Sequence, residues 1–118
     1  MKRMSLILII LCFACNINEV KTPKNILDET SMINVLVDIH IADGMAINSK
    51  ISNAKLLNQV KKLYLESSLE KNNITLEQFE ESLTFYETNP ELLFQIYEKV
   101  MIEISTLEAE VNGTKEEK

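Results

Sequence analysis

The spacing of apolar residues after Asp28 is the feature that most restricts the fold of this chain. Apolar side chains recur there every three or four residues, the period of one helix face, and no useful length alternates with the two-residue period of a strand. The pattern predicts an all-α domain of four helices. They cover about residues 29–48, 53–71, 76–88 and 90–110.

Local signals mark the expected helix starts. Asp28 can cap the first helix, and Thr75 with Gln78 forms a capping box for the third. Asn89 is the expected N-cap of the fourth helix, and Pro90 is tolerated in its first turn because the missing N–H has no partner there in any case. These signals predict short connections between the helices.

A short apolar run near the N-terminus predicts that the protein is exported. Met4–Phe13 follows two basic residues and is only half as long as the roughly twenty residues that span a bilayer, which is typical of a signal peptide. Ala14-Cys15 resembles a lipobox, although Cys12 and Phe13 depart from the strict pattern. We expect cleavage before Cys15 and a lipid on that cysteine. The alternative is an ordinary secretory signal with incidental cysteines.

The leader divides the chain into four expected segments. These are a lipoprotein signal peptide over 1–14, a lipid-anchored tether over 15–25, the helical domain over 26–111 and a charged tail over 112–118. Asn16, rather than Asp, follows the cysteine, so the inner-membrane retention signal of enterobacteria is absent. We expect an outer-membrane lipoprotein that faces the periplasm.

Composition argues against several classes of function. The chain has 12 Lys+Arg against 18 Asp+Glu, and its single arginine, Arg3, lies in the leader, which argues against nucleic-acid binding. Two glycines, Gly44 and Gly113, cannot form a phosphate-binding loop. Both cysteines lie in the leader region, so we expect no metal site and no cofactor in the domain.

His40 and Asp43 are the candidate polar pair of the first helix. Both fall among the apolar residues Leu36, Ile39 and Ile47 on a helical wheel, three residues apart. A buried pair of this kind either forms a metal or acid–base site or fixes helix register through hydrogen bonds. A single histidine without cysteines favours the structural interpretation.

Three serines and one phenylalanine are further candidate site residues. Ser67, Ser68 and Ser82 lack the glycines of a nucleophile elbow, which argues against a serine enzyme. Phe85 lies about 120° from the apolar face of its helix, so either another helix covers it or it contacts a partner.

Two blocks of the sequence resemble the "domain of unknown function 4296" family, small lipoproteins of Bacteroidota. The first block is residues 32–43, MINVLVDIHIAD. The second runs from Ile74-Thr75 through Phe79, Ser82-Leu83, Tyr86 and Pro90-Glu91 to residues 96–100, IYEKV. Gly44 departs from the better helix former expected there. The resemblance implies a helical lipoprotein of the cell envelope and no particular chemistry.

The expected function is a non-enzymatic binding or scaffold module, an accessory subunit of an envelope protein complex. The alternative is a periplasmic chaperone-like or apolar-ligand-binding domain, and an enzyme that uses His40 comes third. A scaffold predicts an exposed apolar patch, a ligand-binding domain an enclosed apolar cavity, and an enzyme a cleft that reaches His40.

Overall fold

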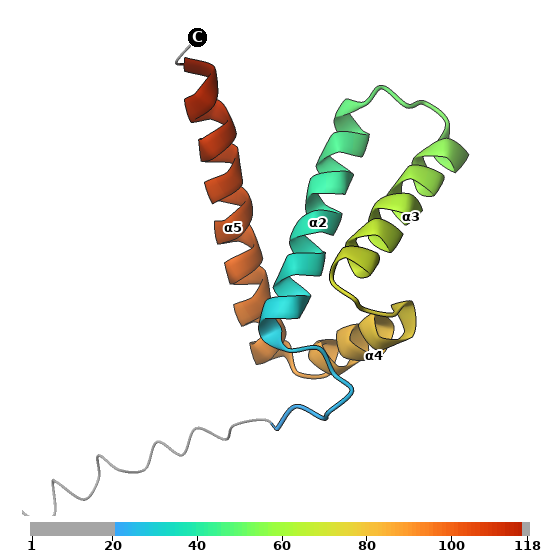
Figure 1. Cartoon of the computed structure of the whole chain (residues 1–118), viewed down its shortest axis with the longest axis vertical. Coiled ribbons are helices and arrows are strands. Elements are labelled where there is room, and N and C mark those ends of the chain that lie inside the picture. The colour runs from blue at the N-terminus through green and yellow to red at the C-terminus, as the bar shows by residue number, and fades with distance from the viewer. Residues whose placement is uncertain (1–20, 117–118) are drawn as a thin grey trace, which may run out of the picture.

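The computed structural model describes residues 21–116, and within them the chain forms four helices and no strand (Figure 1). The helices are α2 (Glu29–Asn48), α3 (Ala54–Lys71), α4 (Leu76–Glu87) and α5 (Pro90–Glu116). The predicted all-α fold with four helices is confirmed. The predicted signal peptide and the predicted lipidation site, Cys15, lie outside the described residues.

α2 is the central helix of the domain. It forms an antiparallel hairpin with α3, packs against α5 on another side, and stands above α4 at the base (Figure 1). α2 and α5 run in the same direction from that base and diverge toward their C-terminal ends (Figure 1). The packing is therefore closest at the base of the molecule.

Two predicted capping residues and one predicted first-turn proline mark the starts of three helices. The Asp28 carboxylate accepts a hydrogen bond from the Ser31 N–H at 2.8 Å, and the Thr75 hydroxyl accepts one from the Gln78 N–H at 3.1 Å. Pro90 begins α5 as predicted. The Asn89 side chain, however, donates to the Phe85 carbonyl at 2.7 Å, so it caps the end of α4.

Asp28→Ala should lower the free energy of unfolding by about 1 kcal/mol, the usual contribution of an N-cap. The hydrogen bonds from Ser31 hold the pKa of the Asp28 carboxyl below its ordinary value. A lowered folded-state pKa means that this stabilisation is complete at neutral pH and is lost as the pH falls through that pKa. Urea unfolding at neutral and acidic pH measures both effects. Asp28→Asn, which caps without titrating, should keep the stability at neutral pH; a difference between wild type and Asp28→Ala that persists unchanged in acid would contradict this account.

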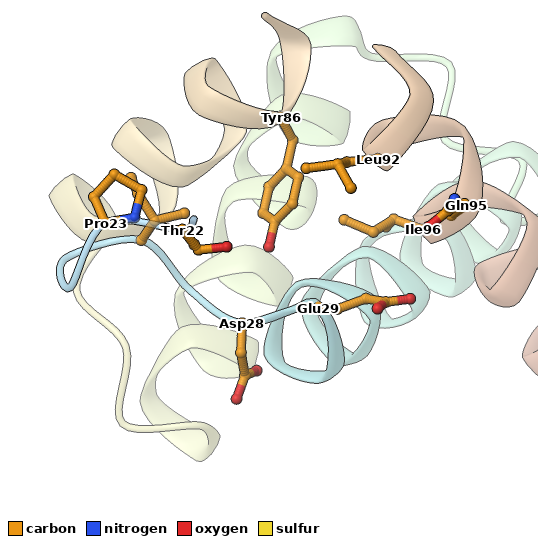
Figure 2. Close-up of a pocket in the computed structure, with 9 residues that line it drawn as sticks. Thr22, Pro23, Asp28, Glu29, Tyr86, Leu92, Gln95 and Ile96 are labelled. Atoms are coloured by element: carbon orange, nitrogen blue, oxygen red, sulfur yellow. The ribbon is translucent and has the colours of Figure 1, made fainter. Parts of the chain in front are cut away.

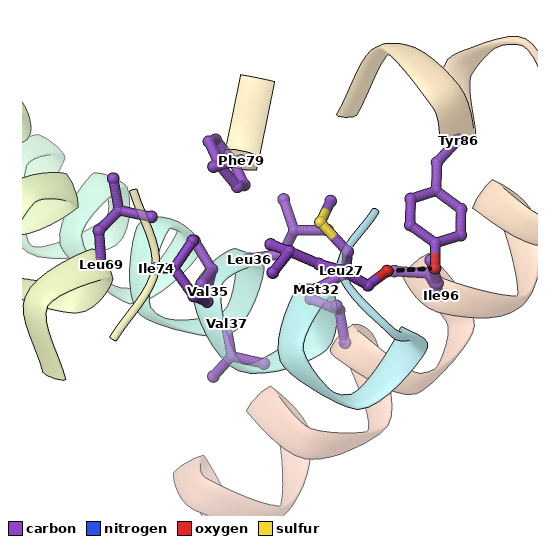
Figure 3. Packing of buried hydrophobic residues seen from close by; sticks show 11 residues of the cluster. Leu27, Met32, Val35, Leu36, Val37, Leu69, Ile74, Phe79, Tyr86 and Ile96 are labelled. Atoms are coloured by element: carbon purple, nitrogen blue, oxygen red, sulfur yellow. Dashed lines mark hydrogen bonds between the residues drawn. The ribbon is translucent and has the colours of Figure 1, made fainter. Parts of the chain in front are cut away.

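The core lies around the first half of α2. Met32 and Val35 are completely buried there, and Ile96 and Val100 of α5 pack into the same cluster. Figure 3 shows side chains from all four helices in this cluster, together with Leu27 of the segment before α2. The remaining buried members are Leu27, Leu36, Val37, Leu69, Ile74, Phe79 and Tyr86.

Two side chains of α4 hold the residue that leads into α2. The Leu27 N–H donates to the Ser82 hydroxyl at 2.8 Å, and the Tyr86 hydroxyl donates to the Leu27 carbonyl at 2.8 Å (Figure 3). Ser82 also donates to the Gln78 carbonyl at 2.6 Å. Both polar groups of the Leu27 backbone are thus satisfied by residues one helical turn apart on α4. We call Leu27, Ser82 and Tyr86 the Leu27 clamp.

The far ends of α2 and α5 differ from the sequence expectation. Ile47 belongs to the predicted apolar stripe of the first helix, yet it is 81% exposed because α5 has moved away from α2 at that level. α5 continues to Glu116 instead of ending near residue 110. Its own helical hydrogen bonds are sufficient to extend it past the core.

Within residues 21–116, α2 meets the length and composition requirements of a membrane-spanning helix. A core helix meets the same requirements, and six α2 residues are buried in the domain. Packing against α3 and α5 therefore accounts for the apolar residues of its buried face, whereas Met45 and Ile47 near its C-terminal end are exposed.

Candidate functional site

The structure does not bring His40 and Asp43 together as a buried pair. The half-buried His40 ring donates from Nδ1 to the Leu36 carbonyl at 2.8 Å and lies edge-on to Tyr97 of α5, with ring centroids 5.9 Å apart. Asp43 forms an ion pair with Lys61 of α3 at 2.8 Å. Side chains three residues apart on a helix differ in direction by about 60°. This difference is enough to point His40 and Asp43 toward different neighbouring helices.

Two of the three candidate serines form side-chain hydrogen bonds within the fold. Ser82 is completely buried within the Leu27 clamp. Ser68 donates to the Asp38 carboxylate at 2.6 Å, and Ser67 is exposed nearby on α3. In the part of the chain that the structure describes, no group of three His, Cys, Asp or Glu side chains is placed to hold a metal ion.

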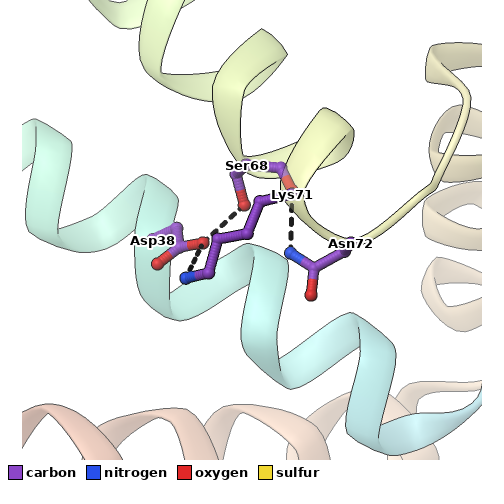
Figure 4. A network of polar contacts seen from close by, with 4 residues as sticks. All are labelled: Asp38, Ser68, Lys71 and Asn72. Carbon is purple, nitrogen blue, oxygen red and sulfur yellow. Dashed lines mark hydrogen bonds and ion pairs between the residues drawn. The ribbon is translucent and has the colours of Figure 1, made fainter.

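A polar network joins the end of α3 to the middle of α2 (Figure 4). Asp38 accepts the Ser68 hydroxyl, and the Lys71 ammonium lies 3.5 Å from the same carboxylate. Asn72 donates to the Ser68 carbonyl at 2.7 Å. These groups satisfy one another, so the network fixes the α2–α3 hairpin.

A hollow of about 280 Å³ lies between the N-terminal segment and the first turns of α5 (Figure 2). Its main polar groups already have partners: Asp28 caps α2, and Glu29 forms an ion pair with Lys99. Burial raises the pKa of the Tyr86 phenol, and the charges of Asp28 and Glu29 add to the effect. The phenol therefore stays protonated and keeps its hydrogen bond to Leu27. The polar groups that line this hollow therefore stabilise the fold.

The first exposed apolar surface is the outer face of α5, which consists of Phe94, Tyr97, Met101 and Ile102. Phe94 and Ile102 are 64% and 65% exposed, and Tyr97 and Met101 are exposed beside them. The four side chains line a shallow groove together with Gln95, Glu98 and Lys99. Isolated exposed apolar residues are common, but four on one helix face form a candidate contact surface.

The second is the open end of the α2–α5 pair, which consists of Gly44, Ile47, Ile104, Leu107 and Val111. Above the contact between His40 and Tyr97, a side chain added at Gly44 would meet nothing within 4 Å. Ile47 and Val111 are 81% and 56% exposed, while Ile104 and Leu107 are half-buried. Ile104 and Leu107 still pack against the core cluster, so the uncovered apolar side chains are Ile47 and Val111 beyond it.

Acidic residues border the α5 side of the open end. At 100° per residue, Glu103 and Glu110 fall along one edge of its apolar stripe and Glu108 along the other. Between Met101 and Thr114 the helix has no Lys or Arg. On its α5 side, the open end therefore combines apolar residues, which we call its floor, with acidic residues along both edges, which we call its rim.

Phe85 lies half-buried against the core, edge-on to Tyr86 with ring centroids 5.3 Å apart. Its role as a partner contact stays a prediction. Phe94 is the most exposed aromatic residue of the described chain, and the sequence analysis missed it. The same signal that singled out Phe85, an aromatic side chain off the apolar stripe of its helix, applies to Phe94 beside the stripe of Leu93, Ile96 and Val100.

Comparison with known proteins identifies one family. A family model described as "Domain of unknown function (DUF4296)" matches residues 23–110, a span that contains α2, α3, α4 and most of α5. No curated protein and no solved structure matches the chain.

Proposed function

The chain belongs to the DUF4296 family, and from that premise we propose that it is a lipid-anchored, non-enzymatic binding module of the bacterial cell envelope. In this proposal the lipid on Cys15 attaches the domain to the outer membrane, facing the periplasm. The domain then serves as an accessory subunit of an envelope protein complex. The observation that carries the proposal is the uncovered apolar surface at the open end of the α2–α5 pair.

The geometry of the open end favours a helical partner. An amphipathic helix that lies between two diverging helices can bury its own apolar stripe against both of theirs. Ile47 on α2 and Val111 on α5 would each lose exposed apolar area on docking, which favours association. A single aliphatic stripe on the partner, with residues spaced by three or four, suits this floor.

The acidic rim favours a partner helix with Lys or Arg beside its apolar stripe. Glu103, Glu108 and Glu110 would pair with such residues and orient the docking helix. A second copy of this chain would instead bring like charges together at the same rim. We therefore assign the open end to a different protein.

The lipid anchor rests on the leader, and fractionation tests it. Cys15→Ala should abolish membrane association and leave the unprocessed or secreted protein in soluble fractions, because the acyl chains are the proposed membrane attachment. Immunoblots of separated membrane and soluble fractions measure this, with Cys12→Ala as the matched control that should leave processing unchanged. A Cys15→Ala protein that stays in the membrane at its mature size would contradict the anchor.

Photo-cross-linking in living cells tests the partner. A photoreactive residue at position 47 or position 111 should form an adduct with the same protein, because both positions line the open end. Position 63 is the control, since Leu63 is 64% exposed on α3 and lies outside the open end. Mass spectrometry should map the adducts to an amphipathic helix with Lys or Arg along its apolar stripe. Adducts from position 63 alone, or mapped to an acidic segment, would refute the proposed docking mode.

A further inference from the structure

We infer that the outer face of α5 lies against the lipid surface that holds the anchor, so that the domain rests on the membrane along this helix. The inference uses the lipid anchor of the proposed function. It adds a second membrane contact, made by Phe94, Met101 and Ile102 on the side of α5 away from the open end, with Tyr97 at the edge where α5 also contacts His40 of α2.

The chain enters the domain beside the first turns of α5. Thr22 and Pro23 line the same hollow as Leu92, Gln95 and Ile96 (Figure 2). Six residues separate Cys15 from Thr22, and a fully extended chain of that length reaches only about 25 Å. A lipid on Cys15 would therefore keep this part of α5 close to the bilayer surface.

The apolar character of the outer face is confined to the turns nearest that entry point. Phe94, Met101 and Ile102 are exposed there, but the positions eleven residues after Phe94, Tyr97 and Met101, which share their directions on the helix, are Ser105, Glu108 and Asn112. A surface that meets the membrane only near the anchor accounts for this change from apolar to polar. A protein groove running along the whole helix would favour apolar residues on both halves.

The side chains of the outer face suit the interfacial region of a bilayer. Phe, Met and Ile can enter the boundary between headgroups and acyl chains, and Tyr97 can keep its hydroxyl among the headgroups. Glu98 and Lys99 beside the groove carry opposite charges, and Lys99 is already paired with Glu29. Apolar insertion, rather than attraction to anionic lipid, is therefore the expected driving force, and a zwitterionic surface is sufficient.

The absence of tryptophan from the chain allows a direct test. The full lipidated protein, carrying Phe94→Trp or the control Ile47→Trp, is reconstituted into zwitterionic phosphatidylcholine vesicles that contain lipid with brominated acyl chains. Both positions are exposed in the domain, so their fluorescence compares two sides of one fold. For Phe94→Trp we expect emission at shorter wavelength and several-fold stronger quenching by the brominated lipid. Adding Met101→Ser and Ile102→Ser to Phe94→Trp should reduce that quenching.

The outcomes separate this inference from the proposed function. If both proteins float with the vesicles and both tryptophans are quenched equally weakly, the outer face does not touch lipid and the inference is wrong while the anchor stands. If neither protein floats, the anchor fails and the inference fails with it. If, in the absence of vesicles, the emission of Phe94→Trp shifts with protein concentration in the unlipidated Cys15→Ala protein, the face belongs to a second copy of the chain, which also overturns the inference.

Discussion

The double variant Ser82→Ala with Tyr86→Phe should lose about 2–6 kcal/mol of unfolding free energy, because each change leaves one buried polar group of Leu27 without a partner. Leu27 is buried beneath α4, so water cannot easily replace either hydrogen bond. A loss of this size is a large part of the roughly 5–15 kcal/mol that stabilises a domain of ordinary stability. Urea unfolding followed by circular dichroism measures it.

The single variants and a surface control complete this test. Ser82→Ala and Tyr86→Phe should each cost about 1–3 kcal/mol. Thr84→Ala is the control, since Thr84 lies between Ser82 and Tyr86 on α4. The Thr84 hydroxyl is exposed and bonds only within the helix, so its removal should change stability little. If the double variant unfolds at the same urea concentration as Thr84→Ala, the Leu27 clamp does not stabilise the domain.

Placing glutamate at both ends of the open surface, in Ile47→Glu with Val111→Glu, should abolish binding of a basic amphipathic helix. The probe is a synthetic eighteen-residue peptide of Leu and Lys with helical periodicity. Removing two exposed apolar contacts and placing negative charge there should weaken peptide binding by roughly thirtyfold or more, the factor that corresponds to a hot-spot loss of about 2 kcal/mol. Fluorescence anisotropy of the labelled peptide measures the affinity.

The controls separate the apolar floor from the acidic rim. Leu63→Glu carries the same chemical change on α3 and should bind the peptide as wild type does. Replacing Glu103, Glu108 and Glu110 with Gln should weaken binding of the peptide and reduce its dependence on salt concentration, because the rim then attracts the lysines of the peptide less. A matched peptide of Leu and Glu should not bind. Equal binding of both peptides by wild type would contradict the charge-selective open end.

The helix boundaries could be predicted because their causes are local. Asp28 and Thr75 act on N–H groups three residues away, so both the capping residue and its partner are visible in one stretch of sequence. The Leu27 clamp has no such local signature. Its two hydrogen bonds join residues 55 and 59 positions apart, and Ser82 and Tyr86 share a helix face without indicating what they face.

The candidate site was harder to predict. The spacing of apolar residues shows which face of a helix is apolar, but it does not show whether another helix covers that face. The stripe that contains Ile47 continues along α2 with an unchanged period, although its neighbour α5 has diverged from it at that level. His40 and Asp43 were placed on the correct turns, but a small rotation between them selects Tyr97 for one and Lys61 for the other. Directions of this kind depend on the crossing of helices, which the sequence pattern does not contain.

Binding at the open end should change the local stability of the last turns of α5. Every residue from Glu108 to Thr114 is exposed, so this segment is supported mainly by its own backbone hydrogen bonds, and a helix without packing is marginally stable in water. Its amides should exchange with deuterium far faster than those near Val100, through local opening that leaves the core intact. A partner helix bound beside Val111 would slow the exchange of these amides. The exchange rate at the end of α5 would therefore report the fraction of the protein that has the partner bound.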